Sequence, residues 1–221
     1  MKSLVIGLDE AGRGPILGPM VIACVALSME AAQHLWAAGV ADSKRFGTGI
    51  RAHQRRCALV KKILAVADHV GVDVVDVADI DRRTLRGELN QLERERADAL
   101  LQAAPPAVRI VADGARLFRP LRARHPQLEA IDQAEQAHPA VAAASIVAKV
   151  RRDELWQRIA ARYAAEFGEL AQAGGGYVNA ATRRFLRAYC ARYRALPPEG
   201  RRSWPWGFAA DLLVGPCSLP L

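Results

Sequence analysis

Acidic side chains end two short apolar segments of this sequence. Asp9 and Glu10 follow the apolar run Ser3–Leu8. Asp113 follows a second run, Val108–Ala112. If the two segments are neighbouring strands of one sheet, Asp9 and Asp113 emerge at the same edge, where their like charges repel each other. A divalent cation relieves this repulsion, since Mg²⁺ and Mn²⁺ prefer oxygen ligands. Two such ions can catalyse phosphodiester hydrolysis, one activating water and the other stabilising the leaving oxygen.

A structural role is the simpler alternative for these acids. Aspartate before glycine is common in turns and at helix N-termini, and Gly114 follows Asp113. Glu10 beside Asp9, with glycines close behind, favours the metal-binding interpretation. The run Asp-Glu-Ala-Gly also resembles a helicase box, but the chain lacks the Gly-Lys pair of a phosphate-binding loop.

Composition limits the classes of protein and partner. The net charge of +8 favours a polyanionic partner, and a solvated arginine-rich surface is the alternative. Hydrophobic residues make up 51% of the 221 residues, enough for the core of one large domain. The four cysteines form no Cys-x-x-Cys zinc motif. The apolar runs at the N-terminus are too short for a signal peptide or a membrane span, so we expect a soluble cytoplasmic protein.

Hydrophobic periodicity predicts strands and helices that alternate along the chain. Predicted strands cover Ser3–Leu8, Met20–Leu27, His69–Val77 and Val108–Ala112. Predicted helices cover Ile50–Val66, Glu88–Gln102, Ala140–Phe167 and Ala180–Arg194. Strands that begin the chain and then alternate with helices indicate an α/β fold, with a mixed sheet flanked by helices.

Five segments, in order, resemble the type 2 ribonuclease H family. They read GLDEAGRGPILGP, DSKR, VADG, AAASIVAKVRRDE and GGGYVNAATRRFL, and lie between residues 5 and 186. The last of them is closest to the archaeal and eukaryotic branch. The resemblance implies a ribonuclease H-like fold in one catalytic domain, residues 1–221. It also implies that residues from about 160 to 221 form a helical C-terminal extension that helps to bind substrate.

The resemblance further implies an activity and a metal site. The activity is hydrolysis of the RNA strand of RNA/DNA hybrids and incision 5′ of single ribonucleotides in duplex DNA, leaving 3′-OH and 5′-phosphate ends. Four carboxylates bind two Mg²⁺ or Mn²⁺ ions in the family, and the first three correspond to Asp9, Glu10 and Asp113. The fourth is usually an aspartate ten residues before the serine that is Ser145 here, and this position holds Glu135. Asp132 is the alternative ligand.

The remaining motifs predict contacts with nucleic acid. Glycines let the backbone approach a ribose closely, so Gly12, Arg13 and Gly14 are expected to read the 2′-OH, or else to form a tight turn. Tyr177 is expected to stack on a sugar or base, or else to pack under its own loop. Other residues are predicted to bind phosphates, unless they form a solvated face: Lys44, Arg45, Ser145, Lys149 and Arg152.

Three functions are consistent with these predictions. The first is a monomeric, metal-dependent endoribonuclease acting on RNA/DNA hybrids and ribonucleotide-containing duplex DNA. The second is a non-catalytic hybrid-binding protein whose altered fourth acid weakens the metal site. The third is the related ribonuclease HIII type, whose usual extra N-terminal domain does not fit before Asp9.

Overall fold

A computed structural model describes residues 3–40, 47, 49–168, 174–204 and 207 of the chain. These residues belong to two compact units, each assembled from several segments. The first unit comprises Met1–Ala11, Val21–Val74 and Leu89–Arg152. The second comprises Gly12–Met20, Val75–Glu88 and Asp153–Leu221. The single catalytic domain, with a C-terminal extension from about residue 160, stays a prediction.

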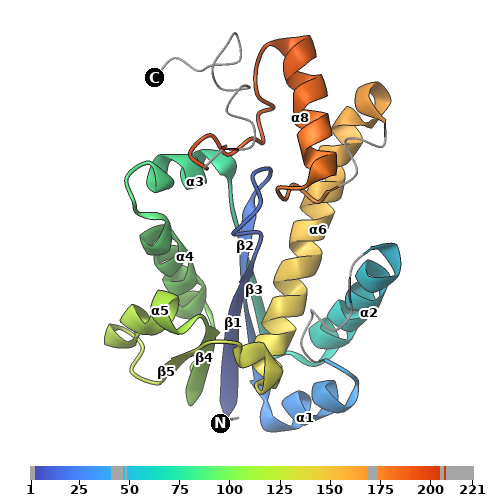
Figure 1. The fold of residues 1–221 in the computed structure, drawn as a ribbon. Coiled ribbons are helices and arrows are strands. Elements are labelled where there is room, and N and C mark those ends of the chain that lie inside the picture. Colours follow the sequence, from blue (N-terminus) through green and yellow to red (C-terminus); the bar gives the residue numbers. More distant parts are fainter. Residues whose placement is uncertain (1–2, 41–46, 48, 169–173, 205–206, 208–221) are drawn as a thin grey trace. The chain divides into compact units, whose positions relative to one another are not determined.

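The first unit is built on a mixed sheet with the strand order β3-β2-β1-β4-β5 (Figure 1). The strands are β1 (Leu4–Ala11), β2 (Met20–Ser28), β3 (His69–Val75), β4 (Arg109–Asp113) and β5 (Leu128–Ile131). β1 pairs antiparallel with β2 and parallel with β4, and β4 pairs parallel with β5. This arrangement confirms the predicted mixed sheet.

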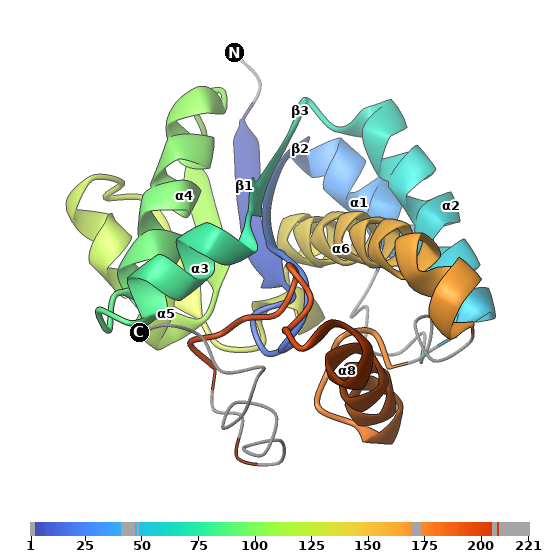
Figure 2. The same cartoon turned by 90° about the horizontal axis from the view of Figure 1, so that it is seen from above.

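Helices cover both faces of this sheet (Figure 2). One face carries α1 (Met29–Ala37), α2 (Ile50–Val66) and the first half of α6 (Pro139–Phe167). The other face carries α4 (Leu89–Ala103) and the short α5 (Ala115–Phe118). Two 3-10 turns, η2 (Arg119–Ala123) and η3 (Ala134–Gln136), complete the elements described in this unit. The result is the predicted α/β layering.

Helix α6 lies directly on β1 because the residues between them are small. Ala142, Ala143 and Ala144 are completely buried. A Cβ atom added to Gly7 of β1 would lie 2.0 Å from the carbonyl carbon of Ala140, far inside van der Waals contact. This close approach positions the α6 side chains relative to the end of β1.

The second unit contains α3 (Val77–Thr84), the second half of α6 and α8 (Ala180–Tyr193). Its core joins the loop after β1 to both long helices. The buried members of this core are Ile16, Leu17, Trp156, Ile159, Ala160, Phe185, Leu186, Cys190 and Leu196. Segments far apart in sequence therefore share one apolar cluster.

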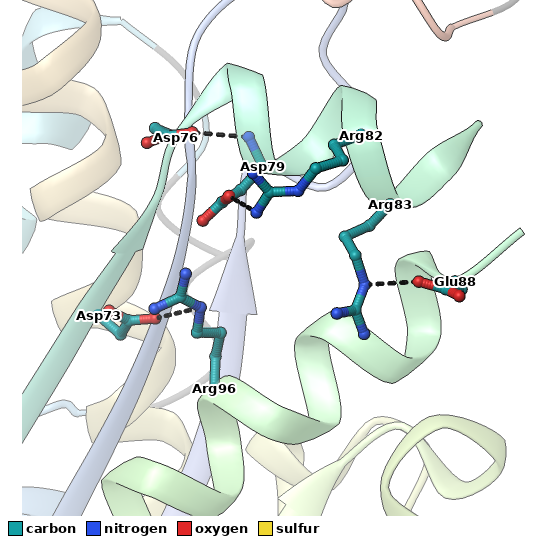
Figure 3. A network of polar contacts seen from close by, with 7 residues as sticks. All are labelled: Asp73, Asp76, Asp79, Arg82, Arg83, Glu88 and Arg96. Carbon is teal, nitrogen blue, oxygen red and sulfur yellow. Dashed lines mark hydrogen bonds and ion pairs between the residues drawn. The ribbon is translucent and has the colours of Figure 1, made fainter. Parts of the chain in front are cut away.

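The strand predicted to reach Val77 ends two residues earlier, at Val75. Asp76 is the reason, because its carboxylate accepts a hydrogen bond of 2.7 Å from the backbone N–H of Asp79 and so begins α3 (Figure 3). Within the helix, Arg82 pairs with Asp79, as expected for side chains three residues apart.

Candidate active site

The acids predicted from the strand ends do lie on neighbouring strands. Leu8 of β1 pairs in parallel with Ala112 of β4, so Asp9 and Asp113 are the next residues of two adjacent strands that run in the same direction. Asp9 is buried, whereas Glu10 and Asp113 are partly exposed. The first three predicted metal ligands therefore lie at one edge of the sheet in the first unit.

Burial and like charge disfavour the ionised form of Asp9. The pKa of its carboxyl is raised well above the ordinary value, first by burial, then by the negative charge of Glu10 and, less strongly, of Asp113. Two hydrogen bonds act in the opposite direction. One comes from the side chain of Ser145 on α6, and the other, of 2.8 Å, from the backbone N–H of Glu10.

Asp113 interacts in turn with Glu135. Burial raises the pKa of Asp113, and the charge and hydrogen bond of Glu135 raise it further. The backbone N–H of Ala134 opposes this by donating a 3.1 Å hydrogen bond to the Asp113 carboxylate. Glu135 lies in η3 and is only 1% exposed. The four predicted acids therefore form one interacting group: Asp9, Glu10, Asp113 and Glu135.

Asp132 is exposed and bonds to the backbone at the start of a helix. Its exposed carboxylate accepts a 2.7 Å hydrogen bond from the backbone N–H of Ala115, at the start of α5. It is not among the largest causes of the raised pKa values of Asp9 and Asp113. The geometry favours Glu135 over Asp132 as the fourth member of the acidic group.

The donor chemistry of this group fits Mg²⁺ or Mn²⁺. Four carboxylates supply oxygen ligands, and a bound cation would favour the ionised forms of Asp9 and Asp113, which burial and neighbouring acids disfavour. Among the described residues, no three His, Cys, Asp or Glu side chains are placed to hold one ion together. Asp9 and Asp113 each accept a backbone hydrogen bond on one carboxylate oxygen, from Glu10 and Ala134, which leaves other lone pairs of the carboxylate for a cation.

The α6 side chains predicted to bind phosphates do not form one exposed basic stripe. Ser145 bonds to Asp9, and Lys149 is partly exposed. Arg152 is only 2% exposed, so the expected basic stripe does not include it. The other predicted phosphate ligands, Lys44 and Arg45, lie outside the described residues.

The second unit brings the two predicted ribose-contacting loops together. The backbone N–H groups of Ile16 and Leu17 both donate to the carbonyl of Gly176, at 2.9 and 3.2 Å. Gly14 is exposed, and a Cβ atom added to it would lie 4.0 Å from the ring of Tyr177. Tyr177 is 44% exposed, which favours a role in stacking over packing under its own loop. Gly14 of the predicted ribose-contacting loop thus lies beside the Tyr177 ring.

The sequence model of the ribonuclease HII family matches residues 6–205. The chain belongs to the ribonuclease HII family. Ribonuclease HII from Caldivirga maquilingensis is 35% identical over 214 residues, covering 92% of this chain and 93% of the relative. Ribonuclease HII from Pyrobaculum neutrophilum is 37% identical over 211 residues, covering 93% and 96%.

Solved structures of this family share the fold. The ribonuclease H2 from Pyrococcus horikoshii OT3 aligns with a TM-score of 0.79 at 28% identity, over 96% of this chain and 100% of that chain. The ribonuclease HII in a complex with PCNA from Archaeoglobus fulgidus aligns with a TM-score of 0.75 at 30% identity, over 91% and 95%. These matches confirm the predicted ribonuclease H-like fold.

Membership of the ribonuclease HII family supports a ribonuclease H activity, directed at RNA/DNA hybrids. Within the part of the chain that the structure describes, no helix is long and apolar enough to cross a bilayer.

Sequence reasoning missed two buried charged residues in the segment after α8. Glu199 is 8% exposed and Arg201 is fully buried. The local sequence Pro-Pro-Glu-Gly-Arg-Arg has the composition of a solvated loop. Only the tertiary contacts of the second unit show that these charges are inside.

Proposed function

We propose that this chain is a metal-dependent endonuclease that hydrolyses the RNA strand of RNA/DNA hybrids. We also propose that it incises 5′ of single ribonucleotides in duplex DNA, leaving 3′-OH and 5′-phosphate ends. The observation that carries the proposal is the interacting group of four carboxylates at the end of β1 and β4. Such a group is electrostatically unfavourable without a cation and is the donor set that a nuclease metal site uses.

Asp9, Glu10, Asp113 and Glu135 would hold two Mg²⁺ or Mn²⁺ ions. When bound, the ions supply Lewis-acid chemistry for phosphodiester hydrolysis. The protein contributes the orientation of the ligands. Ser145 holds the Asp9 carboxylate through its hydrogen bond, and the Ala134 N–H holds Asp113.

The second unit supplies the proposed substrate contacts. Backbone groups of Gly12, Arg13 and Gly14 can exchange hydrogen bonds with a 2′-OH, which distinguishes ribose from deoxyribose. The exposed ring of Tyr177 is available for stacking on a sugar or base. The first unit adds Lys44 and Lys149 as proposed phosphate contacts. We further propose that the protein acts as a monomer in the cytoplasm.

Three labelled duplexes test the proposed function. One is DNA with a single ribonucleotide, the second is an RNA/DNA hybrid, and the third is DNA alone. With Mg²⁺ or Mn²⁺ we expect a cut 5′ of the single ribonucleotide, cuts throughout the RNA strand of the hybrid, and none in DNA. Binding without cleavage would support the non-catalytic alternative. Cleavage of the hybrid alone would support the ribonuclease HIII type.

A further inference from the structure

Arg201 binds the glycine-rich loop of residues 12–18 from inside the second unit. Its guanidinium group donates three hydrogen bonds to backbone carbonyls. Nε bonds to Gly18 at 2.9 Å, Nη1 to Arg13 at 2.7 Å and Nη2 to Gly12 at 2.5 Å. The side chain is fully buried, so one buried cation satisfies three carbonyls of a single loop.

These bonds fix the direction of two peptide groups in the loop. In a trans peptide the C=O and N–H groups point in opposite directions, and the described chain has no cis bond. Because the carbonyls of Gly12 and Arg13 point to Arg201, the N–H groups of Arg13 and Gly14 point away from it. Gly12 has a φ of 84°, which lets the chain adopt this turn.

The backbone around Arg201 also binds the loop. The N–H of Arg201 donates to the carbonyl of Ile16, and the N–H of Gly18 donates to the carbonyl of Glu199, both at 2.8 Å. The ring of Trp204 lies 4.8 Å from the guanidinium carbon and covers it. Residues 199–204 therefore form a strap along the loop, with Arg201 at its centre.

Side chains of the second unit hold this strap at both ends. The hydroxyl of Tyr163 donates a 2.6 Å hydrogen bond to Glu199, which also pairs with Arg162. At the other end, Asp81 accepts hydrogen bonds from the backbone N–H of Ser203 at 3.0 Å and from its hydroxyl at 2.6 Å. These contacts hold both ends of the strap that carries Arg201.

We propose that Arg201 is a positioning residue for ribose selection. It orients the loop so that the N–H groups of Arg13 and Gly14 face the position of the 2′-OH, and this role rests on the proposed function of the loop. An arginine suits the task because its planar fork presents several donors at fixed angles. A lysine in its place keeps the charge but cannot bind all three carbonyls with the same geometry.

Hydrogen exchange of the backbone tests the positioning independently of any activity. In Arg201→Gln we expect amides in residues 12–18 to exchange at least about tenfold faster than in the native protein. Arg82→Gln is the matched control, since Arg82 is an exposed arginine in the same unit that pairs with Asp79. Unchanged exchange in a folded Arg201→Gln protein would overturn the proposal.

Ribose selection is tested by binding without metal, in EDTA, so that the strand stays intact. The readout is the ratio of dissociation constants for all-DNA duplex and for the same duplex with one ribonucleotide. We expect Arg201→Gln to lower this ratio at least about fivefold. The ratio for Arg201→Lys should lie between those of Arg201→Gln and the native protein. Arg82→Gln should keep the native ratio. A purely structural role would weaken both duplexes equally and leave the ratio unchanged, which would overturn the proposal.

The two experiments separate the possible failures. Exchange in residues 12–18 could be faster in Arg201→Gln while the native protein binds both duplexes equally. That result would contradict the proposed function of the loop but not its positioning by Arg201. If both Arg201→Gln and Arg201→Lys lost their cooperative unfolding transition, Arg201 would be a determinant of the fold, and the proposal would be wrong.

Discussion

The carboxylate of Asp9 is almost completely removed from water and lies beside the charges of Glu10 and Asp113. Its pKa is raised well above the ordinary value of 3.8 as a result. The folded protein therefore binds more protons than the unfolded chain between the ordinary and the raised pKa. Across this window, which begins at about pH 4, the free energy of unfolding falls as pH rises.

Asp9→Asn is expected to stabilise the metal-free protein at neutral pH while abolishing cleavage. The amide removes the disfavoured charge, its oxygen can still accept from the Glu10 N–H, and its NH₂ group can donate to the Ser145 hydroxyl. We expect a gain of about 1–2 kcal/mol at pH 8 and a smaller gain at pH 5, measured by urea unfolding in EDTA.

Glu95→Gln provides the control for this substitution, because it removes the same charge from an exposed position on α4. It is expected to change the stability by less than about 0.5 kcal/mol. A loss of stability in Asp9→Asn at pH 8 would show that the native Asp9 charge is not unfavourable.

The sequence allowed three of the four acids to be predicted from physical reasoning. Asp9, Glu10 and Asp113 follow apolar segments, and strand order explains their proximity. Glu135 lies in a single 3-10 turn with no periodic pattern, so only the family resemblance predicted it. Arg201 could not be predicted, because its partners are backbone carbonyls almost two hundred residues earlier in the chain.

At the level of elements, the contact between β1 and α6 determines how the Ser145 side chain reaches Asp9. Gly7 has no side chain, and the backbone of Ala140 occupies the space where one would lie. The first turn of α6 therefore rests directly on the strand that carries Asp9 and Glu10.

Gly7→Ala is expected to displace α6 from β1. The backbone of Ala140 cannot rotate aside as a side chain can, so we expect a loss of at least about 2 kcal/mol in the free energy of unfolding. Gly207→Ala is the control, since no described residue lies within 4 Å of a Cβ atom there. Equal unfolding midpoints for the two variants in urea would contradict this description of the contact.

The start of α8 is fixed by a second local contact. Asn179 accepts a 3.0 Å hydrogen bond from the N–H of Thr182, and its NH₂ group donates a 2.9 Å bond to the carbonyl of Gly174. Asn179 thus caps the helix and also closes the loop that carries Tyr177.

Asn179→Ala is expected to lower the free energy of unfolding by about 1 kcal/mol, the usual cost of losing an N-cap. Asn179→Ser should restore the cap but not the bond to Gly174. Hydrogen exchange in residues 174–178 should therefore be faster in both variants, whereas the unfolding midpoint should fall only in the alanine variant. Native exchange in the serine variant would show that the loop does not depend on the Asn179 side chain.

The long helices and buried strands were predicted well, because their apolar periodicity is local. The predicted bounds of α2 are those observed, and the bounds of α4, α6 and α8 agree within one residue. The strand β5 was missed because it has only 4 residues and depends on pairing with β4. The helix α1 was missed because only Ala31 and Leu35 of its side chains are buried, a weak periodic signal.

At the level of the whole molecule, a protein with a net charge of +8 contains a group of four buried or partly buried acids. The two features suit a nuclease, since the basic residues attract the polyanion and the acids bind cations. The net charge follows from the sequence, but the distribution of arginines between surface and core could not be predicted from it. Arg56, Arg152 and Arg201 are all buried.

Affinity for an RNA/DNA hybrid is expected to fall steeply with salt. Two or more phosphate contacts would reduce binding at least about tenfold between 50 and 200 mM NaCl, because each contact releases counterions from the duplex. Fluorescence anisotropy in EDTA measures this without cleavage. An affinity that stays constant over this range would contradict an electrostatic mode of binding.

We propose that Glu135 completes a catalytic metal site with Asp9, Glu10 and Asp113. The most direct measurement is cleavage of a DNA duplex with one ribonucleotide by Glu135→Gln and Asp132→Asn, over a range of Mg²⁺ and Mn²⁺ concentrations. We expect Glu135→Gln to lose at least about a hundredfold in rate, and Asp132→Asn to cleave like the native protein, because its amide oxygen can still accept from Ala115. Native cleavage by Glu135→Gln, with loss of cleavage in Asp132→Asn, would contradict the account and assign the fourth ligand to Asp132.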